Sequence, residues 1–172
     1  MTEQERRAAL ERALTGQLDD WRGLPAGCTA ADFAALAGGE GAKREGRLAA
    51  APVALVDYGG FAGPLRVFFD DAGHAFLVWA DWPPGDGAES LAPLGPPEAV
   101  LSDQPSRRPG TVQQVWGTRG LAAYVAADGA ARGLALFGPA SVETYLAILG
   151  GDEEPPYRPR GMMANDVARA LP

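Results

Sequence analysis

The sequence predicts an α+β fold, with one twisted antiparallel sheet of about six to seven strands and helices packed mainly on one face. Helical spacing of apolar residues occurs near the two ends of the first 150 residues. Short runs of β-branched and aromatic residues, separated by Gly, Asp and Pro, fill the middle. Because helices and strands are segregated along the chain, an antiparallel meander is expected rather than alternating βαβ units.

The size and composition indicate one globular domain. With 172 residues, 47% of them hydrophobic and 22% charged, the chain can bury a core without a disulfide or metal. Residues 1–150 are predicted to form this domain, and residues 151–172 a Pro-rich exit and a weakly ordered tail. A single Cys and a single His exclude an internal disulfide, a Cys cluster and an HExxH zinc site, so we predict no metal and no cofactor.

The first helix is expected over residues 2–18, where leucines recur every four positions (Leu10, Leu14 and Leu18) and charged residues cover the other faces. Acidic residues in its first turn suit the positive end of the helix dipole. A Gly- and Pro-containing segment over residues 23–27 then ends it.

The second helix is expected over residues 29–37. Thr29 is a good N-cap, and Asp32, three residues later, supplies a short version of the capping box. Cys28 before the cap and Phe33 at the fourth helical position are spaced as a hydrophobic staple. The helix is expected to end at two consecutive glycines.

Six strands are expected, in two groups of three. The ranges are 53–58, 65–69 and 75–79 in the first group, and 112–116, 121–126 and 134–137 in the second. Asp71-Ala72-Gly73 predicts a hairpin turn in the first group, and Asp128-Gly129 predicts one in the second. Each group follows a Leu-Gly-type break, which hints weakly at an internal duplication.

A last helix is expected over residues 140–149, because Pro139 and Ser141 are typical of helix starts. A short helical candidate remains at residues 163–171 in the tail. The predicted core consists of the apolar residues that face inward in these elements: Leu14, Leu18, Phe33, Leu36, Val67, Phe69, Leu77, Trp116, Leu121, Val125, Leu136, Tyr145 and Leu149.

The charge pattern disfavours nucleic acid and favours a basic partner. The chain has 22 acidic and 15 basic residues and no basic stripe. From Val67 to Gln104 there is no Lys or Arg, although acidic residues are frequent. Such a stretch attracts a basic partner, or it is a solvated acidic surface that keeps the protein soluble. No targeting segment and no apolar run of 18 residues is visible, so we predict no membrane span and a cytoplasmic location.

The segment from Gly27 to Gly38, GCTAADFAALAG, resembles a Gly-x-Thr-x-x-Asp/Glu-Val-x-x-Leu-x-Gly pattern in a superfamily of small α+β proteins. The superfamily includes the β-lactamase inhibitor protein and the small lipoprotein of the outer-membrane barrel-assembly machinery. The resemblance covers about residues 24–80 and departs at Phe33, where an aliphatic residue is usual, and in a long insert around residues 43–48. It implies a helix pair packed on an antiparallel sheet and a role in protein binding.

The predicted function is a non-enzymatic protein-binding module of the inhibitor, immunity or adaptor type. Trp79 and Trp82 bracket Ala80-Asp81 and precede a Pro- and Gly-rich loop. Aromatic anchors ringed by charges are typical of interfaces, although a core Trp79 and a Trp82 that caps the sheet end would be the structural alternative. The predicted surface centres on the 79–89 loop and the adjoining 70–71 turn, with Asp70, Asp71, Trp79, Asp81, Trp82, Asp86 and Glu89 as partner-binding residues.

The alternative hypothesis is a small enzyme or ligand-binding protein that uses Cys28, His74 and Asp70-Asp71. Cys28 lies at a helix N-terminus, where a thiol pKa is lowered, and His74 is the one available imidazole. A buried Cys that acts as a small hydrophobe is the simpler interpretation. Asp70, Asp71 and Asp81 could together hold a divalent cation, but acids in a tight turn are more often there for turn chemistry.

Overall fold

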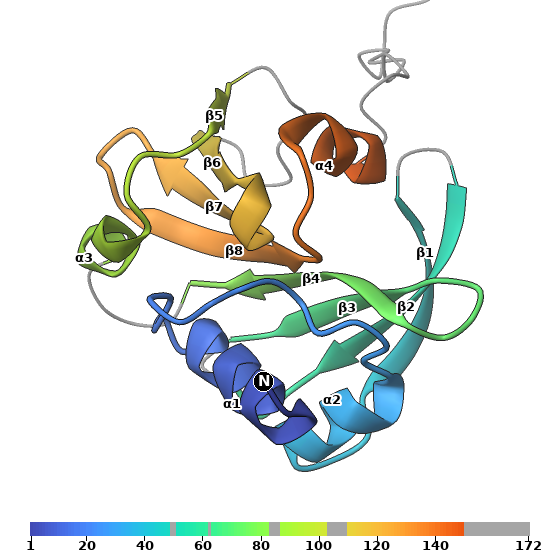
Figure 1. Cartoon of the computed structure of the whole chain (residues 1–172). Helices are drawn as coiled ribbons and strands as arrows, with labels where there is room; N and C mark the ends of the chain where they lie inside the picture. Colours follow the sequence, from blue (N-terminus) through green and yellow to red (C-terminus); the bar gives the residue numbers. More distant parts are fainter. Residues whose placement is uncertain (49–50, 62, 83–86, 103–109, 150–172) are drawn as a thin grey trace, which may run out of the picture.

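The computed structural model describes residues 1–48, 51–61, 63–82, 87–102 and 110–149 (Figure 1). These residues form one antiparallel sheet of eight strands in the order β1-β2-β3-β4-β8-β7-β6-β5. The predicted α+β class is confirmed, but the sheet has eight strands rather than six to seven. The tail over residues 151–172, with its helical candidate, lies outside the described residues.

The strands are β1 (Ala42–Leu48), β2 (Ala51–Tyr58), β3 (Leu65–Phe69), β4 (Ala75–Asp81), β5 (Ala99–Leu101), β6 (Thr111–Trp116), β7 (Leu121–Ala126) and β8 (Ala131–Phe137). The helices are α1 (Glu3–Leu14), α2 (Ala30–Ala37), α3 (Gly87–Leu91) and α4 (Val142–Leu149), with single 3-10 turns η1 (Ala92–Leu94) and η2 (Gly117–Arg119). Within the described residues, no helix has the length and apolar character needed to cross a bilayer.

The two strands that were not predicted, β1 and β5, form the two edges of the sheet. Strand β1 has the sequence AKREGRL and is exposed over most of its length, so it lacks the alternation of a half-buried strand. Strand β5 has three residues, which is too short for a periodic signal.

Helix α1 is shorter than predicted, because it ends at Leu14 instead of continuing to residue 18. Thr15 caps it, and Gly16 turns the chain with a φ of 86°. Leu18 is still buried, because the chain continues across the same surface after the helix. Helix α2 begins as predicted: the Thr29 N–H donates to Asp32 Oδ2 at 2.7 Å, and Thr29 Oγ1 accepts from the Asp32 N–H at 3.4 Å.

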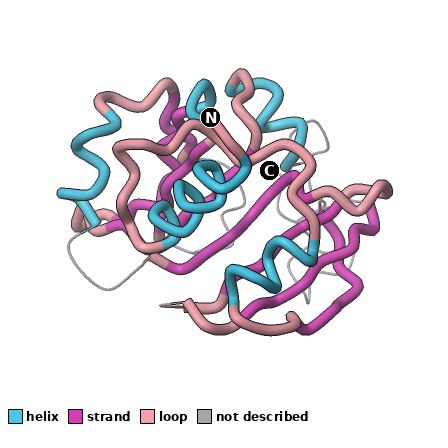
Figure 2. Tube along the Cα trace, turned by 60° about the horizontal axis from the view of Figure 1, so that its bottom comes forward, coloured by secondary structure: helices cyan, strands magenta, loops and turns pink. Residues whose placement is uncertain are grey.

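The sheet separates two buried clusters, because successive side chains of a strand point to opposite faces. We call these the α1 face and the α4 face. Helices α1 and α2 pack on the α1 face with residues such as Val67, Val78 and Leu136. Helix α4 packs on the α4 face with residues such as Phe68 and Phe137. Figure 1 shows α4 on one side of the sheet and α1 and α2 on the other, and helices also flank the strands on both sides in Figure 2.

The prediction that the helix at residues 140–149 shares a face with the other two is therefore wrong. The Tyr145 ring of α4 stacks on Phe137 with centroids 4.3 Å apart, whereas the preceding residue, Leu136, faces α1. Of the thirteen predicted core residues, Leu36 and Leu149 are half-buried and the other eleven are buried. The core was predicted correctly as a set, but its division between two faces was not.

The two halves of the sheet have the same plan, which supports the weak hint of duplication. Each half begins with short helical turns that end at a glycine with positive φ, Gly38 (71°) after α2 and Gly95 (72°) after η1. Each then continues as a meander of four antiparallel strands. The last strands of the two meanders, β4 and β8, pair with each other at the centre of the sheet.

The inner hairpins of the two halves, β3–β4 and β7–β8, are also alike. Gly73 donates its N–H to the Asp70 carbonyl at 2.9 Å, and Gly129 donates to the Ala126 carbonyl at the same distance. A register shift lies next to each turn, between Phe68 and Phe69 in β3 and between Tyr124 and Val125 in β7. This correspondence lets positions of one half be compared with positions of the other.

We predict that Gly120→Ala and Gly129→Ala differ strongly in cost. Both glycines have positive φ, 64° and 83°, which costs an alanine about 1–2 kcal/mol. A Cβ at Gly120 would also lie 2.1 Å from the Phe137 carbonyl oxygen, whereas a Cβ at Gly129 would meet nothing within 4 Å. We expect a loss of about 3 kcal/mol or more for Gly120→Ala and about 1 kcal/mol for Gly129→Ala in urea unfolding. Equal losses would contradict the close approach of η2 to β8.

Candidate functional site

A row of side chains crosses the α4 face of six strands, which follow one another in the sheet as β2, β3, β4, β8, β7 and β6. Pairing places Asp57 of β2 beside Arg66 of β3, and Arg66 beside Trp79 of β4. The row continues through small apolar residues of the second half, Ala135, Ala122 and Val115. The row is therefore charged and aromatic in the first half and small and apolar in the second.

Helix α4 covers the apolar part of this row. Tyr145, which is fully buried, belongs to the cluster that contains Val115, Ala122 and Ala135. Its ring stacks on Phe137, and its hydroxyl lies 3.4 Å from Gln113 Oε1 as a hydrogen-bond donor. Burial raises the pKa of Tyr145 well above its ordinary value, and the nearby Tyr124 adds to this effect. This hydroxyl is held as a neutral structural group.

The charged part of the row borders an open cavity of about 750 Å³ on the same face. Most of its polar and aromatic lining comes from five strands: Arg44, Asp57, Arg66, Trp79, Asp81 and Tyr124. Three residues of the α1-face cluster, Tyr58, Ala80 and Leu134, also line it. Between β2 and β3, three glycines, Phe61 and Pro64 also line the cavity. A cavity of this volume with a few polar groups is the usual form of a binding site.

Two arginines share one carboxylate in this cavity. Arg66 Nε lies 2.8 Å from Asp57 Oδ1, and Arg44 Nε lies 2.9 Å from Asp57 Oδ2. Arg66 Nη2 lies farther away, 3.5 Å from Asp57 Oδ2. The Asp57 side chain is 18% exposed, compared with 37% for Arg66 and 61% for Arg44. The trio therefore carries two positive charges and one negative charge at a half-buried position.

Trp79 and Asp81 form the part of the cavity nearest to the centre of the sheet. The Trp79 ring meets Phe68 edge to face, with centroids 4.6 Å apart, and this contact fixes its position. Asp81 pairs with Gly133 of β8. Gly63 lies so close that a Cβ there would be 2.9 Å from Asp81 Cβ. Asp81 thus lies between two glycines, Gly63 and Gly133, and lines the cavity.

The predicted partner surface is divided between the two faces of the sheet. Trp79 and Asp81 line the cavity on the α4 face. Trp82 instead is partly buried and packs against the cluster of the α1 face. Its backbone N–H donates to the Arg132 carbonyl at 3.2 Å. Glu89 is exposed on α3, and Asp86 lies outside the described residues. Trp82 thus caps the end of the sheet, as the structural alternative expects.

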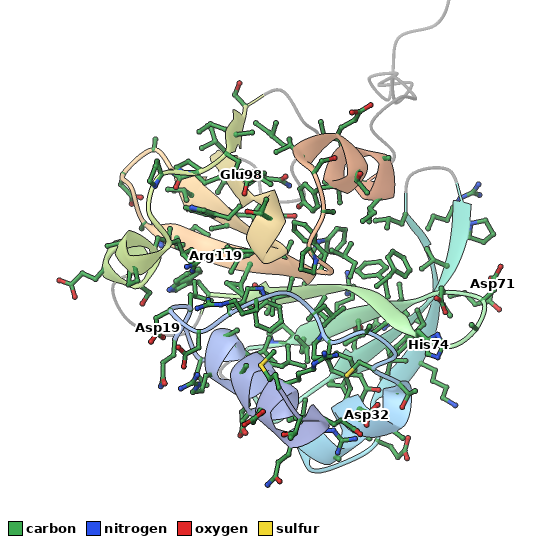
Figure 3. All side chains as sticks on the ribbon, viewed as in Figure 1. Asp19, Asp32, Asp71, His74, Glu98 and Arg119 are labelled. Atoms are coloured by element: carbon green, nitrogen blue, oxygen red, sulfur yellow. The ribbon has the colours of Figure 1, made fainter. Side chains whose placement is uncertain are left out.

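The turn at residues 70–71 does not adjoin residues 79–82, the described start of the 79–89 loop, so the predicted contact between turn and loop is wrong for these residues. Strand β4 separates them, and its seven residues span about 20 Å. Figure 3 shows Asp71 and His74 at the tip of the β3–β4 hairpin. Asp70 Oδ1 accepts from the N–H groups of Ala72 and His74 at 3.0 and 2.8 Å, which is turn chemistry. Among the described residues, no three His, Cys, Asp or Glu side chains are grouped to hold a metal ion.

Cys28 and His74 are neighbours in the backbone but not in their side chains. Thr29 pairs with His74, and the Ala75 N–H donates to the Cys28 carbonyl at 2.8 Å. Because paired residues project to the same side, His74 projects with Thr29, opposite to Cys28. The His74 side chain is half exposed, whereas Cys28 is buried in the cluster of the α1 face.

A second cavity, of about 420 Å³, is lined by Cys28 with Arg7 and Asp32, and not by His74 or the 70–71 turn. Burial raises the pKa of the Cys28 thiol to about 11, and the neighbouring Asp32 carboxylate contributes. Partial burial opposes ionisation of Asp32, but hydrogen bonds from Thr29 and the Arg7 guanidinium outweigh it and hold its pKa below 3.8. The acid beside the thiol is thus charged at neutral pH and suppresses the thiolate.

We predict that Cys28 reacts slowly with iodoacetamide and that His74 has no influence on the rate. With a pKa of about 11, only about 0.1% of the thiol is ionised at pH 8. Intact-mass measurements should show slow modification of the native protein, the same rate in His74→Ala, and fast modification in 6 M urea. Fast native modification that is lost in His74→Ala would restore the Cys–His hypothesis.

The sequence analysis missed Arg44, Asp57 and Arg66. A usable signal was present for two of them, because Asp57 and Arg66 each interrupt an apolar strand, Val56-Asp57-Tyr58 and Leu65-Arg66-Val67. A charged residue at such a position needs a partner on the same face, and neighbouring strands supply it. Arg44 gave no such signal, because its strand is charged along most of its length.

No protein-family model matches this chain, and no curated protein matches it. Among solved structures it is similar to a DUF4309 family protein, YjgB, from Bacillus subtilis, with 13% sequence identity and a TM-score of 0.41. The similarity covers 77% of this chain and 99% of that one. A likeness of this size carries no information about the function of the chain.

Proposed function

We propose that the protein is a non-enzymatic binding protein and that the cavity on the α4 face receives a partner protein. One observation carries this proposal. The row across the α4 face is covered by α4 in the second half, whereas the corresponding charged and aromatic positions of the first half border an open cavity. Arginine and tryptophan are the residue types that contribute most to binding at protein interfaces.

The chemistry of the cavity favours binding over catalysis. Arg44 and Arg66 are permanent cations, which do not transfer protons, and both are bound to Asp57. Trp79 offers an apolar surface that is already held in place by Phe68. The alternative site at Cys28 has a protonated thiol at neutral pH and a histidine that projects to the opposite side.

The partner is proposed to bring a basic group to Asp81, which keeps the basic-partner prediction in a more local form. Asp81 lines the cavity, and Trp79, two residues earlier on the same strand and face, lines it as well. A lysine or arginine stem would pack on Trp79 while its charge meets Asp81. The resemblance to the superfamily of the β-lactamase inhibitor protein is compatible with this role and stays a prediction.

We predict that Gly59→Trp abolishes partner binding without harming the fold. Gly59 lines the cavity, has no positive φ, and a Cβ there would meet nothing within 4 Å. The new indole therefore occupies the cavity rather than the core. Gly39, after α2, is equally open and lies outside the cavity, so Gly39→Trp is the matched control.

Wild type and both variants are used as immobilised bait in a lysate of the source organism, and the retained proteins are quantified by mass spectrometry. The proposal expects at least one protein that wild type and Gly39→Trp retain and Gly59→Trp does not. Identical retention by all three baits would contradict the assignment of the cavity as the partner site.

With the captured partner purified, we predict that Asp81→Asn slows association and weakens its dependence on salt. A carboxylate that meets a cation accelerates the encounter, and salt screens this attraction. Surface kinetics at two salt concentrations measure both effects, with Asp128→Asn in the β7–β8 turn as the control. Unchanged association and an unchanged salt dependence would show that the partner brings no basic group to Asp81.

A further inference from the structure

We propose that Arg44 and Arg66 together bind a single carboxylate, an acidic side chain of the partner that enters the cavity beside Asp57. The inference rests on the proposed function, because it names the group that the cavity recognises. It also goes beyond the basic-partner prediction, because it assigns to the partner a negative group that binds the two arginines, in addition to the basic group that meets Asp81.

The two arginines have more N–H donors than Asp57 can accept. Each guanidinium has five N–H donors, and one carboxylate offers about four acceptor positions. Both arginines reach Asp57 through Nε, at 2.9 and 2.8 Å, so Asp57 is contacted from two sides. A second carboxylate would accept from the outer guanidinium nitrogens and complete the bidentate geometry that arginine favours.

The two halves of the sheet carry different residues at corresponding positions of the same strand plan. In the second half, Val115 and Ala122 hold the positions that correspond to Asp57 and Arg66. Both pairs occur in the same kind of antiparallel ladder, so the ladder does not need charged residues at these positions. An ion pair at a half-buried position contributes little to stability, and apolar residues pack there equally well. The charged trio is therefore better explained by recognition than by folding.

The charged side chains around the cavity limit the charge that the ligand can carry. The trio carries a net positive charge of one, and Asp81 lies on the same face one strand from Arg66. The net charge of the trio suits a monoanion, whereas Asp57 and Asp81 would repel a dianionic phosphate. Trp79 and Phe61 also line the cavity and offer contact to the apolar stem of the group that carries the charge. A carboxylate on an aromatic or aliphatic stem fits this combination.

The test uses three probes that share a stem and differ in charge: 3-phenylpropionate, 3-phenylpropionamide and 3-phenylpropylamine. Each is titrated into the full chain, and the arginine Nε–Hε and tryptophan indole signals are followed by ¹⁵N NMR. We expect the carboxylate to bind at least about tenfold more tightly than the amide, because charge-assisted hydrogen bonds are the stronger class. The shifts should concentrate on the side chains of Arg44, Arg66 and Trp79.

Variants identify the groups responsible. Arg66→Gln and, independently, the more exposed Arg44→Gln should each weaken the carboxylate about tenfold. Arg66→Lys should weaken carboxylate binding less than Arg66→Gln does, because lysine keeps the positive charge although it lacks the forked N–H donors of the guanidinium. Arg12→Gln is the matched control, since Arg12 forms an ion pair with Asp20 on the opposite side of the sheet. Asp57→Asn should strengthen binding of the carboxylate severalfold, because it removes the negative charge that competes for the two arginines, and a purely structural trio would not produce this gain.

Equal binding of the acid and the amide, equal losses in Arg66→Gln and Arg12→Gln, or tighter binding of phenyl phosphate than of phenylpropionate would overturn the proposal. Different outcomes would contradict the proposed function. If Gly59→Trp loses the captured protein but no carboxylate preference exists, the binding role stands and this inference is wrong. If the carboxylate binds as expected but Gly59→Trp retains every protein, the cavity is a small-molecule site and the protein-binding role is wrong.

Discussion

The pairing of β4 with β8 is the constraint on which the rest of the fold depends. Five residue pairs join the two meanders, from Leu77 with Phe137 to Asp81 with Gly133. Most side chains along this seam are buried, although Trp79 and Asp81 are only partly so, and neither strand could end its half without exposing apolar surface. One continuous row across the α4 face exists because this seam brings the two halves into register.

The β4–β8 pairing also divides the α4 face into a half that α4 covers and a half that stays open. On the β8 side, Ala135 and Ala122 leave room for Tyr145, and α4 closes the surface. On the β4 side, Trp79 fills the corresponding position and Arg66 stands next to it, so a helix could not lie as close. The two halves share one strand geometry, and the size of a few side chains distinguishes the closed half from the open one.

Much of the fold could be predicted from the sequence, because the relevant signals are local. The Thr29 cap, both inner hairpins and most of the core follow from residue type and spacing. The face that α4 covers could not be predicted in this way, since it depends on the direction in which the chain leaves β8. Strand β1 was missed for a related reason: its charged sequence is that of an exposed edge, which carries little periodicity.

The candidate site was harder to predict than the fold, because its residues come from strands that are distant in sequence. The run without Lys or Arg suggested one acidic surface, yet folding places Asp70 and Asp81 at opposite ends of the β3–β4 hairpin. It also brings Arg66 and Arg44 close to the acids of the α4 face. Net charge along a sequence segment is therefore a poor guide to charge on a surface of a sheet, where each neighbour belongs to another strand.

The position of Arg44 on β1 has a consequence for the local stability of the site. An edge strand is held by one ladder only, and β1 is exposed over most of its length, so its opening exposes little apolar surface. Openings of this kind need less free energy than global unfolding. Fraying of β1 would remove one guanidinium from Asp57 while the other seven strands stay paired. The cavity can therefore lose half of its positive charge on warming well below the temperature at which the protein unfolds, and a bound partner that holds β1 in place would suppress hydrogen exchange along this edge.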